Sequence, residues 1–204
     1  MNENQDRAEH ILETALMLGE RHGWDAVHLH DVAQQAGIVL AEIHRHYRQK
    51  DDLAEAWFDR ADLALIRAGE CAEWDSLVVR ERLQRTILAW FDALAPHREM
   101  SIEMLRYKLQ PDHLHLQVAG LMRISRTVQW IRETARLPTV GWRRELEEVV
   151  LTGIFLSTVG CWLLDRSPGA RRTRVWLEEK LAAAERVALR FPNGLAPWTP
   201  SRMP

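Results

Sequence analysis

The sequence has little of what secreted and membrane proteins carry. Only two cysteines occur, Cys71 and Cys161, and they lie far apart, so we expect a reducing cytoplasm rather than a disulfide framework. The first ten residues, MNENQDRAEH, are charged and lack the apolar stretch of a signal peptide. No apolar run approaches the ~20 residues of a membrane span. We therefore expect a cytoplasmic protein without a membrane span.

The chain also lacks the motifs that accompany most catalytic chemistry. It has no G-x-S-x-G elbow, no glycine-rich phosphate loop, no C-x-x-C and no H-E-x-x-H. The pairs His28/His30 and His44/His46 are spaced by two residues, which places their side chains on different faces of a helix and makes them poor chelators. We therefore expect no enzyme, no catalytic residue, no metal site and no cofactor.

Helical periodicity dominates what is present. The chain has 204 residues, of which 47% are hydrophobic, enough for a sizeable core, and the formal net charge of −2 does not suggest a polyanion binder by bulk charge alone. No strand-like alternation of useful length occurs, so an all-α fold of about nine helices is predicted. The expected helices cover residues 5–21, 29–36, 40–46, 51–68, 76–94, 98–108, 111–136, 142–164 and 172–190. Asp75 or Ser76 is the expected N-cap of the fifth.

The stretch Gly23–Lys50 holds two short helical patterns separated by a glycine. Leu29, Val32, Ala33 and Ala36 are spaced as one face of a short helix. Gly37 can then adopt the positive φ that commonly ends a helix. A second pattern over residues 40–46 places Ile43 inward. Two short helices joined by such a turn form a helix-turn-helix, whose second helix can enter a DNA major groove.

This region resembles the DNA-binding domain of the TetR family of bacterial repressors. The matching positions are Ile11, Ala15, Gly23, Ala26, Leu29, Asp31, Val32, Ala33, Ala36, Gly37, Ile38, Ile43, Tyr47, Lys50 and Leu53. The resemblance implies a three-helix helix-turn-helix domain over residues 1–50 and a helical effector-binding and dimerisation domain over 51–191, followed here by an extended Pro-rich tail over 192–204. It also implies a ligand-responsive repressor that binds palindromic double-stranded DNA as a homodimer.

The expected DNA contacts gather on and around the second motif helix. They are His28, Leu40, Ala41, His44, Arg45, His46, Arg48 and Lys50. Arg45 can bond O6 and N7 of guanine, and Leu40 and Ala41 can contact a thymine methyl group. Lys50 matches a position that usually touches phosphate in the family.

Several DNA-facing positions depart from the family pattern. Val27-His28 and Val39 stand where the family usually has a capping Ser or Thr. Glu42 would repel phosphate, although a carboxylate can accept a hydrogen bond from cytosine N4. In residues 1–50, eight acidic residues outnumber five Lys and Arg. A fold that has lost DNA binding therefore remains an open alternative.

Two further sets follow from the resemblance and from residue type. A pocket for a small apolar or amphipathic ligand is expected from large, adaptable residues on the middle helices: Trp57, Trp90, Met100, Met104, Tyr107, Met122 and Trp130. A dimer interface is expected from small and apolar residues on the last two helices: Val150, Gly153, Ile154, Ser157, Cys161, Trp176, Leu177, Leu181 and Ala184. The same residues could instead fill the chain's own core.

A second resemblance offers an alternative function. The segment WLLDRSPGARRTRVWLEEKL resembles the C-terminal half of lipid-binding accessory proteins of ubiquinone biosynthesis, which share this fold without acting as repressors. It implies binding of a lipid and no binding of DNA.

Overall fold

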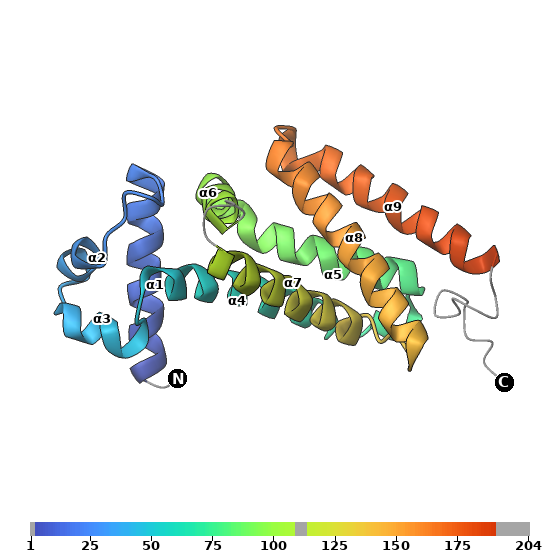
Figure 1. Cartoon of the computed structure of the whole chain (residues 1–204), viewed down its shortest axis with the longest axis horizontal. Helices are drawn as coiled ribbons and strands as arrows, with labels where there is room; N and C mark the ends of the chain where they lie inside the picture. The colour runs from blue at the N-terminus through green and yellow to red at the C-terminus, as the bar shows by residue number, and fades with distance from the viewer. Residues whose placement is uncertain (1–2, 109–113, 191–204) are drawn as a thin grey trace. The chain divides into compact units, whose positions relative to one another are not determined.

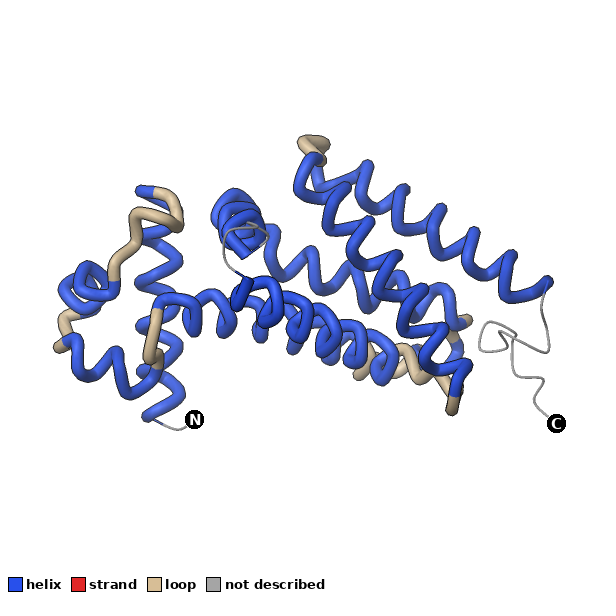
Figure 2. Tube along the Cα trace, in the orientation of Figure 1, coloured by secondary structure: helices blue, strands red, loops and turns tan. Residues whose placement is uncertain are grey.

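The computed structural model describes residues 3–108 and 114–190, and this part of the chain contains helices and turns but no strand (Figures 1 and 2). The predicted all-α class is therefore confirmed. The predicted tail over 192–204 and the side chain of Tyr107 lie outside the described residues.

The chain folds as two compact units, each built from segments that are distant in sequence. The first combines Met1–Ala61 with Ala93–Gln117, and the second combines Asp62–Asp92 with Val118–Pro204. This division falls within α4 (Lys50–Ala68) rather than at residue 50, where the resemblance places the domain boundary.

The first unit holds α1 (Glu3–His22), α2 (Leu29–Ala36), α3 (Leu40–His46) and the start of α4. Its helices form because apolar residues recur at helical spacing and bury one face of each element. The side chains at the centre of this core are Ile11, Leu12, Leu16, Trp24, Val32, Ile43 and Leu53.

The helix α6 (Arg98–Lys108) also belongs to this first unit. Met100 packs against α1 at Gly19, where an added Cβ would lie 2.7 Å from the methionine sulfur. The Glu103 carboxylate accepts a hydrogen bond from the backbone N–H of Trp24 at 2.6 Å. Gly19, which has no side chain to clash with Met100, allows α6 to pack closely against the end of α1. Glu103 binds α6 to the turn that follows α1.

The second unit contains α5 (Val79–Leu94), most of α7 (Leu114–Thr134), α8 (Trp142–Leu164) and α9 (Arg171–Arg190). Its core is rich in aromatic rings. Phe155 of α8 lies edge-on to Trp90 at 5.2 Å between ring centroids, and Phe91 lies 5.6 Å from Trp162. Such geometries favour aromatic pairs beyond the burial of their surface.

Two buried ion pairs connect helices of the second unit. Asp62 accepts hydrogen bonds from Trp90 and Thr127 on one carboxylate oxygen and from Arg123 on the other. Arg132 of α7 donates to Glu147 of α8 at 2.8 Å, and both side chains are 3% exposed. Because every buried charge must find a partner, these pairs restrict how the helices can be arranged.

The turn between α8 and α9 is organised by one carboxylate. Asp165 accepts hydrogen bonds from the backbone N–H and hydroxyl of Ser167, and from the same two groups of Thr173, at 2.6–2.8 Å. Thr173 lies in the first turn of α9, where backbone N–H groups have no partner within the helix. Burial would raise the pKa of the Asp165 carboxyl, but these four hydrogen bonds hold it well below its usual range.

The predicted N-cap of α5 was wrong. Asp75 and Ser76 lie in a short 3₁₀ turn, Trp74–Ser76, and α5 begins later at Val79. One N–H at the start of α5 is bound from within the helix, because the Glu81 carboxylate accepts a hydrogen bond from the Val78 N–H at 3.2 Å.

Candidate nucleic-acid interface

The helix-turn-helix predicted from the sequence is present. Gly37 ends α2 with a φ of 68°, and its N–H donates to the carbonyls of Ala33 and Gln34. Val39, in extended conformation, precedes α3. The turn therefore depends on the one residue type that adopts positive φ without steric cost.

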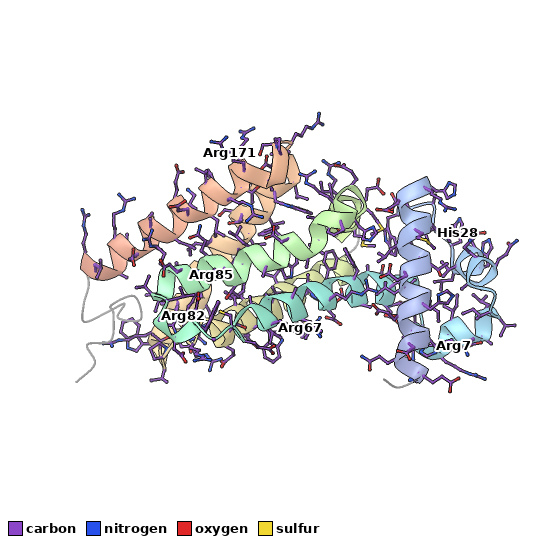
Figure 3. The ribbon with its side chains drawn as sticks, turned by 180° about the vertical axis from the view of Figure 1, so that it is seen from behind. Arg7, His28, Arg67, Arg82, Arg85 and Arg171 are labelled. Carbon is purple, nitrogen blue, oxygen red and sulfur yellow. The ribbon has the colours of Figure 1, made fainter. Side chains whose placement is uncertain are left out.

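Three residues of the motif fix the rotation of α3 against α1. Ile43 is fully buried. The hydroxyl of Tyr47, just beyond the helix, donates to the carbonyl of Ala8 at 3.1 Å. Glu42 forms an ion pair with Arg7 at 3.1 Å, and Figure 3 shows Arg7 on α1 beside α3. Together these contacts determine which residues of α3 face solvent.

The outward face of α3 and the residue just after it carry most of the expected DNA contacts. Ala41, His44 and Arg45 are exposed and follow the spacing i, i+3 and i+4 of one helix face, and Arg48, also exposed, lies just beyond the end of the helix. Leu40, at the start of the helix, is 51% exposed. A stripe with arginines and small or apolar side chains offers both hydrogen-bond donors and methyl contacts for base edges.

The other expected DNA contacts differ in accessibility. His28, which is labelled in Figure 3, is exposed at the start of α2. Its ring stacks on that of His30 at 5.3 Å between centroids. His46 and Lys50 are half-buried. The Lys50 ammonium donates to the carbonyl of Asp25 at 3.1 Å and lies 5.1 Å from the centre of the Trp24 ring. Burial lowers the pKa of Lys50, and the nearby Asp25 and Asp51 oppose that shift.

The helix starts lack the capping side chains that the family usually has. Neither His28 before α2 nor Val39 before α3 makes a side-chain hydrogen bond to its helix.

Three of the acidic residues within residues 1–50 are engaged in ion pairs that the sequence did not reveal. Arg60 of α4 contacts both Glu9 and Glu13 of α1 at 2.7 Å. Glu42 is held by Arg7, as described above. Arg60 lies outside residues 1–50, so a count over that segment omits this cation, although the unit as a whole stays acidic. No sequence spacing indicates either contact.

The expected effector residues do not gather in one compact unit. Trp57, Met100 and Met104 are buried in the first unit, and Trp90 is buried in the second. The indole of Trp57 donates to the Ser101 hydroxyl at 2.9 Å. Met122 and Trp130 are exposed on α7, at 70% and 43%. The effector assignment stays a prediction.

The expected dimer residues divide into a buried and an accessible group. Ile154, Leu177 and Leu181 are buried within the chain, where α8 packs against α9. Val150 and Gly153 are exposed, and Ser157, Cys161, Trp176 and Ala184 are half-buried. The interface assignment also stays a prediction.

Sequence reasoning missed most of an exposed stripe on α8, since only Gly153 of it was among the expected dimer residues. It comprises Trp142, Leu146, Val149, Gly153, Leu156 and Gly160, all exposed in the single chain. These residues alternate in steps of four and three, the spacing of a seam between packed helices. The heptad spacing is visible in the sequence, but only burial separates this stripe from the face directed at α9.

Within the described residues, α8 is long and apolar enough to cross a membrane by length and composition, with 39% of its apolar window buried. This differs from the sequence-based expectation that no apolar stretch approaches that length. The apolar character of α8 comes from two faces, one buried against α9 and one exposed in the stripe.

Comparisons with known proteins agree with this geometry. The family model of bacterial regulatory proteins of the tetR family matches residues 11–57. A TetR transcriptional regulator from Nitrosomonas europaea is 39% identical, with a TM-score of 0.77 over 86% of this chain and 96% of that one. A tetR-family transcriptional regulator from Streptomyces coelicolor is 18% identical, with a TM-score of 0.64 over 100% and 94% of the two chains, and supports the fold alone. No protein of curated function matches the chain. The 39% identity over nearly the whole of the Nitrosomonas protein, together with the helix-turn-helix match, shows that the chain belongs to the TetR family of transcriptional regulators.

Proposed function

We propose that the chain is a homodimeric, ligand-responsive repressor that binds palindromic operator DNA in the cytoplasm and has no enzymatic activity. The observation that carries the DNA-binding part is the exposed face of α3 with Ala41, His44 and Arg45, followed directly by the exposed Arg48. Within the described residues neither arginine forms an ion pair, whereas Glu42 on the same helix is engaged by Arg7. The two arginines can therefore bind DNA, and the carboxylate of Glu42 on α3 is already paired with Arg7.

Dimerisation is supported by the exposed stripe on α8. Single exposed apolar residues are ordinary, but a continuous row along a helix of 23 residues is typical of a surface that packs against another helix. The glycines at 153 and 160 would allow the partner helix to approach closely. A two-fold dimer would present two copies of α3 to successive major grooves, which explains why a palindrome is the expected site.

Ligand response follows from the family, and we assign it to a small apolar or amphipathic molecule. Such a ligand releases DNA only if it binds the DNA-incompetent conformation better than the competent one. The lipid-binding alternative is not favoured. The Asp165-x-Ser167-Pro168 turn that suggested it has a sufficient structural role in capping α9.

The test is selection from a pool of random duplexes, followed by titration of the selected site at several salt concentrations. A palindrome should emerge, with affinity that falls steeply as salt rises. Changing Arg45 and Arg48 to alanine should weaken binding, whereas Arg21→Ala, an exposed arginine near the other end of α1 from Arg7, should not. Absence of any selected sequence, or equal effects of the two changes, would contradict the assignment.

A further inference from the structure

The ion pair between Arg7 and Glu42 lies beside the residues that face DNA. Glu42 occupies the first turn of α3, and its side chain is 24% exposed. A surface hollow of about 350 Å³ is lined by Glu3, Asn4, Arg7, Glu42, Arg45 and His46. Arg7 and Arg45 therefore border the same space as the Glu42 carboxylate.

Helix geometry gives Glu42 a second potential partner. Residues three and four positions apart are neighbours on a helix surface, and a carboxylate followed three residues later by an arginine forms a favourable pair. Arg45 stands in that position relative to Glu42. In the structure, however, the carboxylate is bound to Arg7, and Arg45 forms no ion pair within the described residues.

We propose that Arg7 is a positioning residue for DNA recognition: by binding Glu42 from α1, it prevents the carboxylate from pairing with Arg45 and leaves the Arg45 guanidinium available to a base. This inference rests on the proposed DNA-binding function. Arg7 need not touch DNA for this role, because it acts through Glu42. Without Arg7, the same carboxylate would neutralise the cation that reads the operator and would add a negative charge next to phosphate.

Two other roles for these residues give different results. If Arg7 contacts phosphate directly, its loss weakens binding whatever residue stands at position 42. If Glu42 accepts a hydrogen bond from cytosine N4, its own replacement weakens binding. Only the positioning role makes the effect of removing Arg7 depend on the presence of the carboxylate.

The experiment is a double-mutant cycle on the full chain, measured with the operator selected by the wild type. The four proteins are wild type, Arg7→Ala, Glu42→Gln and the double variant. Arg7→Ala should weaken binding by about fivefold to tenfold, since one arginine contact to a base is compromised. Glu42→Gln should bind within about twofold of wild type, and the double variant should match Glu42→Gln because no carboxylate remains to capture Arg45. Arg7→Lys should retain most of the affinity, since it keeps a cation beside Glu42.

Melting temperatures and salt slopes separate this role from a structural one. All variants should melt within about 2 °C of wild type, because a partly exposed ion pair contributes little to stability. A direct phosphate contact by Arg7 would make Arg7→Ala lower the salt slope by about one, both in the wild type and in the Glu42→Gln variant. An equal loss of affinity from Arg7→Ala in both backgrounds, or a loss from Glu42→Gln alone, overturns the inference and leaves the proposed function intact. A wild-type protein that selects no DNA overturns both.

Discussion

Replacing Asp165 by asparagine should destabilise the second unit strongly. The carboxylate is 3% exposed and accepts four hydrogen bonds, two of them from backbone N–H groups of Ser167 and Thr173. Asparagine keeps the shape but turns an NH₂ group toward two of these donors. A hydrogen bond to a charged group contributes about 1.5–3 kcal/mol, and losses within one network are not additive, so we expect about 3 kcal/mol at neutral pH. For a chain of this size that corresponds to a fall in melting temperature of about 6–12 °C.

The same change should alter how stability depends on pH. Because the pKa of Asp165 is lower in the folded chain than in the unfolded one, its contribution is complete above the unfolded pKa of about 3.9 and is lost as pH falls below it. Urea unfolding of wild type and Asp165→Asn should therefore differ by a constant free energy from about pH 7 to about pH 5 and converge at lower pH.

The matched control is Asp92→Asn. Asp92 also contacts α9, through Arg174, but it is exposed, so its loss should cost no more than about 1 kcal/mol. A loss of less than about 1 kcal/mol for Asp165→Asn at pH 7, or a difference that widens on acidification, would refute the assigned role of the carboxylate.

Three further predictions concern the motif, the dimer and the histidines. Gly37→Ala should lower the free energy of unfolding by about 1–2 kcal/mol. The cost comes from the positive φ alone, because nothing lies within 4 Å of the added methyl group. An unchanged urea titration would contradict this. Leu156→Glu, which places a charge in the exposed α8 stripe, should convert the dimer to a monomer in sedimentation at micromolar concentration. Its circular dichroism spectrum should stay unchanged. A persistent dimer would exclude the α8 stripe as the interface. Histidine in general gains charge as pH falls from about 7.5 to about 6, so the affinity of the wild type for DNA should rise as pH falls over that interval. His44→Gln should make this rise smaller. Equal wild-type affinities at both pH values and fixed salt would reject a phosphate-facing histidine.

The sequence was most informative where structure is set by near neighbours. The bounds of α2 and α3 follow from an apolar face, a glycine with positive φ and an inward Ile43, all within a short stretch. The sequence misplaces the start of α5 because Asp75 and Ser76 have side chains typical of an N-cap but lie in a short 3₁₀ turn, whereas the contact at the helix start comes from Glu81.

What could not be predicted depends on contacts between distant residues. The pairing of Arg60 with Glu9 and Glu13, and of Arg7 with Glu42, follows from how α1 lies against α4 and α3. Periodicity shows which face of a helix is apolar, but it does not show which helix covers that face. For the same reason, the assignment of Leu177 and Leu181 to the dimer could not be separated from packing within the chain.

The position of α6 within the first unit has a consequence for dissecting the protein. A fragment ending at residue 61 would retain the helix-turn-helix but lose three contacts made by α6. Met100 covers Gly19, the Ser101 hydroxyl accepts a hydrogen bond from the Trp57 indole, and the Glu103 carboxylate accepts one from the Trp24 N–H. Such a fragment would expose two tryptophans and deprive the Trp24 N–H of its carboxylate partner. The DNA-binding part is thus not a transferable module of contiguous sequence, and chimeric regulators made from this chain would have to carry α6 with it.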